Sequence, residues 1–197
     1  TMVFNYGDDF RGEIIADAND NAYISSFTYA SNFPVTAGAY DQSYNGGQDA
    51  VVFKMNSNLS SMIWSTYLGG SQDDAAYSLR VDSNGEVYVV GGTNSSNFPT
   101  TAGVLNQNYM GGTSTGYVNI AGDGFITRLS ATGSSLTAST YFGTTSFDEI
   151  FFVDLDASNN VYVYGYTQGN IAPTAGVYAN PGSSQFVTKL DPALNSV

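Results

Sequence analysis

Acidic side chains occur in pairs at three corresponding places in the chain, and carboxylates in such a pattern can attract a cation or divide acid and base roles. Each pair stands just before a segment that has the character of a β-strand. We expect these turns to form an acidic rim that attracts cations or polyhydroxylated ligands; the alternative is a solvated turn, where Asp is favoured. The pairs are Asp8-Asp9, Asp73-Asp74 and Asp148-Glu149.

Oxygen-bearing side chains alternate in a second recurring segment, which reads DANDN, DSNGE and DASNN and begins at Asp17, Asp82 and Asp156. This pattern is similar to part of a calcium loop, but it lacks the distant bidentate Glu of such loops. The alternative is a β-turn in which each Asp accepts hydrogen bonds from nearby backbone amides. Calcium is the less favoured alternative, and no other metal or cofactor is expected.

A single cation recurs in a third segment, at Lys54, Arg128 and Lys189. A charged residue in a strand that is covered on both sides should be paired. We therefore expect each cation to meet a carboxylate of its own or the adjacent unit, and we treat all three as candidates for ion pairs between units. The alternative is a stem that packs along the strand while its charge reaches solvent.

Tyrosines are frequent in the three variable loops, residues 29–48, 94–122 and 168–183. A tyrosine offers a flat, amphipathic contact at small entropic cost, so these residues are candidates for binding a ligand. The alternative is that each ring folds back and caps its own loop. The candidates are Tyr40, Tyr44, Tyr109, Tyr117 and Tyr178.

The composition excludes several classes of function. The chain of 197 residues carries a formal net charge of -12, with five basic residues, so a nucleic-acid backbone is an improbable partner. It contains no Cys and no His, which removes disulfides, thiolate metal sites and Ser-His-Asp chemistry. No apolar run approaches the roughly 20 residues that span a bilayer. Repeated carboxylates that look equivalent give no asymmetric catalytic pair, so we expect no enzyme activity.

Internal repetition organises the chain. The phrases NFPVTAGAY (32–40), NFPTTAGVL (97–105) and NIAPTAGVY (170–178) align, as do WSTYLGG (64–70) and ASTYFGT (138–144). In the first phrase Pro34 fixes a turn and Gly38 allows a tight bend. We predict three repeats, at 1–68, 69–142 and 143–197, with an insertion at 113–121 in the second and an incomplete outer strand in the third.

Each unit has the pattern of four short strands separated by turn residues. In the second unit these are expected near 76–82, 87–93, 124–130 and 136–142. The second strands, VYVV at 87–90 and VYVY at 161–164, are apolar at successive positions, which predicts burial on both faces. Four-stranded units of this length favour an all-β fold of β-propeller blades, with about three antiparallel repeats.

The combination of STYLGG, DD, VDSNGEVYVVGGT, NFPTTAG and YNGG followed by DAVVFKMN resembles the SBBP repeat of β-propellers. The resemblance covers almost the whole chain, although the third unit departs from it with NIAPTAG and NPGSS. It implies an exported bacterial protein, secreted or at the cell surface, of a kind associated with Bacteroidetes, gliding motility and type IX secretion. The family implies a platform without fixed catalytic residues.

Three blades are too few to close a ring of about four to eight, so the sequence predicts a slice of a larger propeller. The competing possibility is that residues 1–4 complete the third blade. We expect a non-catalytic extracellular module for binding or scaffolding, with a glycan, a protein or further repeats of the same parent chain as partner and no membrane span. The alternatives are a glycosidase or lyase that uses carboxylates such as Asp74 and Asp148, and a purely structural spacer.

Overall fold

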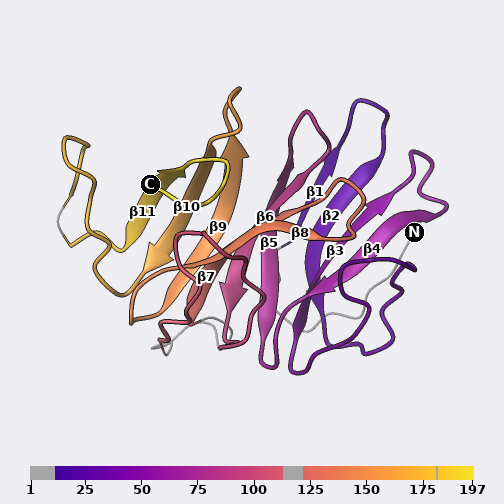
Figure 1. Ribbon diagram of the computed structural model, residues 1–197, viewed down its shortest axis with the longest axis horizontal. Helices are drawn as coiled ribbons and strands as arrows, with labels where there is room; N and C mark the ends of the chain where they lie inside the picture. Colours follow the sequence, from indigo (N-terminus) through magenta and orange to yellow (C-terminus); the bar gives the residue numbers. More distant parts are fainter. Residues whose placement is uncertain (1–11, 113–121, 181) are drawn as a thin grey trace.

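The computed structural model describes residues 12–112, 122–180 and 182–197 and shows an all-β protein with three antiparallel sheets (Figure 1). The described residues contain no helix, so none that is long and apolar enough to cross a membrane. The predicted all-β class with about three antiparallel repeats is confirmed. The insertion at 113–121 and the proposed pairing of residues 1–4 lie outside the described residues.

Each sheet is formed by strands that are consecutive in the chain, and neighbouring strands pair antiparallel. The first sheet contains β1 (Glu13–Ala16), β2 (Ala22–Thr28), β3 (Asp49–Met55) and β4 (Met62–Leu68). The second contains β5 (Asp74–Val81), β6 (Val87–Thr93), β7 (Asp123–Leu129) and β8 (Leu136–Phe142). The third contains β9 (Asp148–Leu155), β10 (Val161–Thr167) and β11 (Gln185–Leu190). The four strands predicted in the second unit are therefore present, within two residues at each end.

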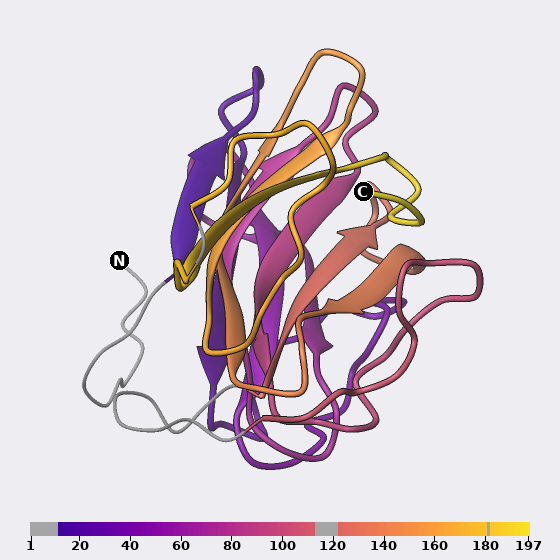
Figure 2. The same cartoon turned by 90° about the vertical axis from the view of Figure 1, so that its left-hand side faces the viewer.

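The three sheets stand side by side in sequence order, and a view from the end of the row shows them one behind another (Figure 2). The first strands of the second and third sheets each contact the sheet before: β5 contacts β2 and β3, and β9 contacts β6 and β7. The first strands also contact one another, β1 with β5 and β5 with β9. These three strands therefore share the inner side of the arrangement, as the first strands of neighbouring propeller blades do.

Apolar side chains fill the space between the first and second sheets. The first sheet contributes Tyr23, Val52 and Trp64, and the second contributes Leu79 and Phe125 among others. All are buried because both sheets present an apolar face to the same gap. Burial of this apolar surface is the main force holding the two sheets together.

A second apolar cluster joins the second and third sheets. It includes Tyr88, Val90 and Ile126 from the second sheet, and Ile150 and Val161 from the third. Because successive side chains of a strand point to opposite faces, β6 uses alternate residues in the two clusters. Every residue of β6 is buried, so the predicted burial of 87–90 on both faces is confirmed.

The same prediction is wrong for the strand at 161–164. Val161 and Val163 of β10 are buried, but Tyr162 is 37% exposed and Tyr164 is only partly buried. On neighbouring strands, Phe152 is 55% and Val187 73% exposed. No sheet among the described residues covers this face, which is why a strand with the sequence pattern of a buried one is half open to solvent.

The repeated TAG phrases take the same backbone form in all three units. Gly38, Gly103 and Gly176 have φ angles of +79°, +81° and +85°, which side chains disfavour and glycine permits. The tight bend predicted at Gly38 is confirmed. The phrase also contributes to the core, because Phe33 and Phe98 are buried against the tyrosines of β4 and β8.

Candidate functional site

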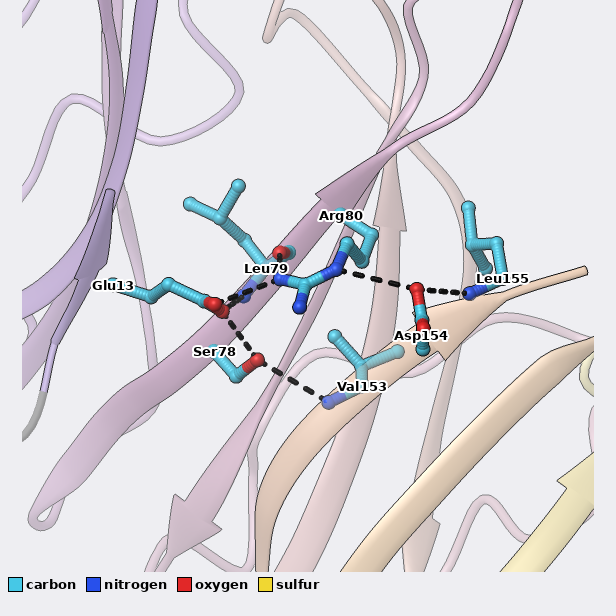
Figure 3. Close-up of polar contacts among 7 residues, drawn as sticks. All are labelled: Glu13, Ser78, Leu79, Arg80, Val153, Asp154 and Leu155. Atoms are coloured by element: carbon cyan, nitrogen blue, oxygen red, sulfur yellow. Dashed lines mark hydrogen bonds and ion pairs between the residues drawn. The ribbon is translucent and has the colours of Figure 1, made fainter. Parts of the chain in front are cut away.

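A polar network joins the three inner strands and is centred on Arg80 of β5 (Figure 3). The Arg80 guanidinium forms an ion pair with Glu13 of β1 at 2.8 Å and with Asp154 of β9 at 3.3 Å. Glu13 also accepts hydrogen bonds from the Ser78 hydroxyl at 2.5 Å and from the Leu79 amide at 2.9 Å. Ser78 in turn accepts one from the Val153 amide at 3.2 Å. A single cluster therefore links all three sheets.

Electrostatics favour the charged form of Glu13 within this network. Partial burial alone would raise the pKa of the Glu13 carboxyl, but hydrogen bonds from Ser78, Arg80 and the Leu79 amide outweigh it and lower the pKa. Arg80 is about one third exposed, so water screens part of the attraction. The network fixes the position of the inner strands relative to one another.

The network was not predicted from the sequence, because the predictions rest on residues that the three units share and Arg80 is at a position where the units differ. Arg80 aligns with Ile15 in the first unit and with Asp154 in the third. Opposite charges at equivalent positions of neighbouring units are the signal that could have found this contact.

The three predicted cations are paired, but within their own sheets. Lys54 lies 3.3 Å from Asp17, and Lys189 lies 3.2 Å from Asp156. Arg128 pairs with Glu86 and is 4.0 Å from Asp82. The expected carboxylate partner is therefore confirmed within each cation's own unit. The assignment of these residues to ion pairs between units is wrong, because each cation faces the turn that joins the first two strands of the same sheet.

A tyrosine of the second strand completes each of these groups. It lies opposite the cation in the strand register, and the cation stands over its ring at 4.5 to 5.3 Å from the ring centroid. Such contacts add a modest cation–π attraction. The three pairs are Tyr23 with Lys54, Tyr88 with Arg128, and Tyr162 with Lys189.

The oxygen-rich turns take the hydrogen-bonded form that was one of the two alternatives. Oδ1 of Asp17 accepts from the amides of Asn19 and Asn21, at 2.9 and 3.0 Å. Burial opposes ionisation, but the hydrogen bonds from Asn21 and Asn19 lower the pKa of Asp17 to about 2. Asp82 and Asp156 bind the amides of their own turns in the same way. In the described part of the chain, no group of three or more acidic residues is arranged to hold a metal ion.

The acidic pairs do not form an open rim in the described residues. Asp74 and Asp148 are fully buried and Glu149 is 3% exposed, whereas Asp8 and Asp9 lie outside the described residues. Asp74 accepts hydrogen bonds from Thr93, from Ser95 at 2.8 Å and from the Gly70 amide at 2.7 Å. Asp73 accepts from the Gln48 amide at 2.9 Å. These carboxylates hold together the loops that connect one sheet to the next. We call these places joints: the first is at residues 69–74 and the second at residues 143–148.

Two further buried carboxylates, missed by sequence reasoning, lie at the same joints. Asp49 begins β3 and Asp123 begins β7, and both are fully buried. Around the position that a Cβ on Gly69 would occupy, Oδ1 of Asp49 lies at 3.1 Å and Oδ2 of Asp74 at 2.7 Å. A glycine is required there because the two carboxylates occupy the space of a side chain.

Burial determines the protonation of these groups. Burial raises the pKa of Asp49 to about 6 and that of Asp74 to about 7, although hydrogen bonds act in the opposite direction. At the second joint, burial raises the pKa of Asp123 to about 7 and also raises that of Asp148. Each joint therefore contains a pair of carboxyl groups whose pKa values burial raises.

The candidate binding tyrosines divide into two groups. Tyr40 and Tyr109 pack against the cluster between the first two sheets, and the Tyr44 hydroxyl donates to the Gly47 carbonyl of its own loop. Tyr178 is 94% exposed, and Tyr117 lies outside the described residues. Three candidates are thus engaged within the protein, and Tyr178 remains open to a partner.

The exposure of Tyr178 reflects its place at the end of the row of sheets. Its equivalents in the other units, Tyr40 and Leu105, each donate their amide to a turn of the next sheet, at Gly133 and Leu194, both at 2.8 Å. No further sheet follows the third among the described residues, so Tyr178 lacks this contact.

Comparison with known families supports the repeat architecture. Residues 63–99 match the SBBP β-propeller repeat. The matched segment begins in β4 and ends just after Phe98, so it contains STYLGG, the acidic pair, β5, the hydrogen-bonded turn and β6. No curated protein matches the chain. The match and the three antiparallel sheets together support a repeat protein with propeller-type blades.

Proposed function

We propose that this propeller-repeat protein is a non-catalytic binding or scaffold platform, displayed outside the cell or on its surface. The observation that supports it best is that the repeated polar side chains contact other parts of the protein, while an aromatic side chain is left exposed. The repeated cations, turn aspartates and joint carboxylates are all engaged in internal contacts, whereas Tyr178 and Val177 of the third loop are 94% and 56% exposed. The partner that suits such a loop is a glycan or a protein surface that can pack against an aromatic ring.

An enzyme is the less favoured alternative because its carboxylates would have to reach the substrate. Glycoside hydrolysis needs two carboxyl groups about 5 to 10 Å apart that contact the scissile bond. The raised pKa values at the joints would suit an acid catalyst, but Asp74 and Asp148 are fully buried and are hydrogen-bonded to their own loops. A purely structural spacer remains the second alternative, and it differs only if the loops bind nothing.

The test is a glycan array and surface cross-linking with the 197-residue chain. We expect a defined set of bound glycans or one saturable protein partner, with binding lost in Tyr178→Ala. Tyr29→Ala is the matched control, since Tyr29 is also an exposed loop tyrosine, at 58%. Equal loss of binding in both variants would show that Tyr178 is not the specific binding site. No binding by the unmodified chain would favour the structural spacer. Turnover of oligosaccharides by the unmodified chain would contradict the proposal.

A further inference from the structure

The chain contains two Asn-Gly sequences, and they lie in different structural settings. Asn45-Gly46 belongs to the long loop between β2 and β3, whereas Asn84-Gly85 lies in the tight turn between β5 and β6. Both asparagines are exposed. An asparagine followed by glycine can lose its side-chain amide without an enzyme, because a residue without a side chain lets its backbone nitrogen approach the preceding side-chain carbonyl. The fold decides whether that nitrogen is available.

The turn after β5 holds the nitrogen that would react with Asn84. The Gly85 amide donates to the Asp82 carbonyl at 3.0 Å. The amides of Asn84 and Glu86 on either side donate to the Asp82 carboxylate, at 2.8 and 3.0 Å. Three successive amides are therefore held by one aspartate. Attack on the Asn84 side chain would first have to break the hydrogen bond of Gly85, which adds to the barrier.

The loop between β2 and β3 leaves the corresponding nitrogen unrestrained. In the described part of the chain, the Gly46 amide donates to no backbone or side-chain acceptor. Gly46 has a φ of +127°, which glycine permits and side chains disfavour. Asn45 is held instead: its own amide donates to Asp49 Oδ2 and its side-chain nitrogen to Asp41 Oδ2, both at 2.6 Å. The side chain that would be attacked is thus fixed, next to a nitrogen that no hydrogen bond restrains.

We propose that Asn45 is a site of spontaneous modification, at which the folded chain converts asparagine into aspartate and isoaspartate. The Gly46 nitrogen loses its proton and bonds to Cγ of Asn45, while the bond from Cγ to the side-chain nitrogen breaks. That nitrogen takes up the proton and leaves as ammonia, and a succinimide remains. Water then opens the succinimide. Cleavage between Cγ and the Gly46 nitrogen gives aspartate, and cleavage between the main-chain carbonyl carbon and that nitrogen gives isoaspartate.

The product would disturb the two carboxylates that Asn45 binds. A carboxylate in place of the Asn45 amide would stand against Asp41 Oδ2, so a hydrogen bond would become a contact between like charges. Isoaspartate also lengthens the main chain, which moves the amide of residue 45 relative to Asp49, the buried carboxyl group of the first joint. Conversion therefore loosens residues 41–47. This loop is separate from the Tyr178 surface proposed above, so either proposal can fail alone.

The test follows both Asn-Gly sequences of the 197-residue chain during incubation at neutral pH, by peptide mapping with mass spectrometry. Conversion adds the mass difference between a carboxyl and an amide group, and an isoaspartate methyltransferase labels the isoaspartate product. In the folded chain we expect Asn45 to convert roughly tenfold faster than Asn84, because of the hydrogen bond that holds Gly85. In urea, which removes the fold, the two rates should become similar. Asn45→Gln should abolish the labelling at this loop.

Equal conversion of Asn45 and Asn84 in the folded chain, or none at Asn45, would overturn the proposed site. A preference for Asn45 that persists in urea would also overturn it, because the fold would then not be its cause.

Hydrogen exchange tests the consequence for the loop. Asn45→Asp should speed exchange of the amides of residues 41–47 about fivefold, because the hydrogen bond to Asp41 is lost. Asn84→Asp introduces the same charge into the turn after β5 and should leave the loop unchanged. Unchanged exchange in Asn45→Asp, or equal changes in both variants, would overturn the effect on the loop.

Discussion

The second and third sheets contain nearly the same central strand, but their surroundings differ. VYVVGGT of β6 is buried throughout, whereas VYVYGYT of β10 leaves Tyr162 37% exposed. The difference lies in the neighbours, because among the described residues β6 has a sheet on each side and β10 has one. An apolar strand sequence therefore indicates that both faces are suited to burial, and the number of neighbouring sheets decides whether both are buried.

The largest expected effect comes from equivalent tyrosines in these two strands. Tyr88→Ala removes a fully buried ring and should lower the free energy of unfolding by about 3–5 kcal/mol. Tyr162→Ala removes a ring with one side in water and should cost about 1 kcal/mol or less. Chemical denaturation of both variants measures the difference. Equal losses would mean that the open face of the third sheet is covered in solution.

A second effect concerns the buried Asp that begins the third strand of the first two sheets, Asp49 or Asp123, which is replaced by Ser184 in the third unit. The folded-state pKa of Asp123, about 7, exceeds the value near 4 of an unfolded Asp, so the folded state binds more protons between these values. This contribution to stability should therefore be fully present below about pH 4 and be lost as the pH rises to about 7. For a shift of three units this amounts to about 4 kcal/mol at most.

Asp123→Asn tests whether this carboxyl group causes the pH dependence. The Asn side chain keeps an oxygen that can accept from the Met110 amide, and its NH₂ group takes the place of Oδ1, which has no hydrogen-bond partner among the described residues. The fall in stability between pH 4 and 7 should become smaller in this variant. Asp20→Asn, at an exposed turn, should leave the slope as in the unmodified chain. An unchanged slope in Asp123→Asn would refute the role of the joint carboxyls.

The sequence predicted the repeats, the strands and the hydrogen-bonded turns because these depend on neighbours in the chain. Burial of Asp74 could not be predicted, because it depends on packing of Gly69, Thr93 and Ser95 around one carboxylate. The Arg80 network was missed for a related reason, since Arg80 pairs with residues 67 and 74 positions away. Such contacts are set by how sheets stack.

A smaller effect is expected at Arg80, whose two ion pairs connect all three sheets. Arg80→Met should lower the free energy of unfolding by about 1–2 kcal/mol, because the pairs are partly screened by water and Glu13 loses its partner. Lys189→Met is the matched control: its pair with Asp156 lies within the third sheet and is about half exposed, so no measurable change is expected. Thermal and chemical unfolding would compare the two variants. Similar losses of stability would show that the Arg80 network stabilises the fold no more than an ion pair within one sheet.

Backbone hydrogen exchange, followed by mass spectrometry, tests the contrast between the second and third sheets most directly. The amides of β7 lie between β6 and β8, so we expect them to exchange only on global unfolding. Those of the outer side of β11, which no described strand pairs, should exchange orders of magnitude faster. Equally slow exchange in β7 and β11 would contradict the account, because it would show that both sides of β11 are covered in solution.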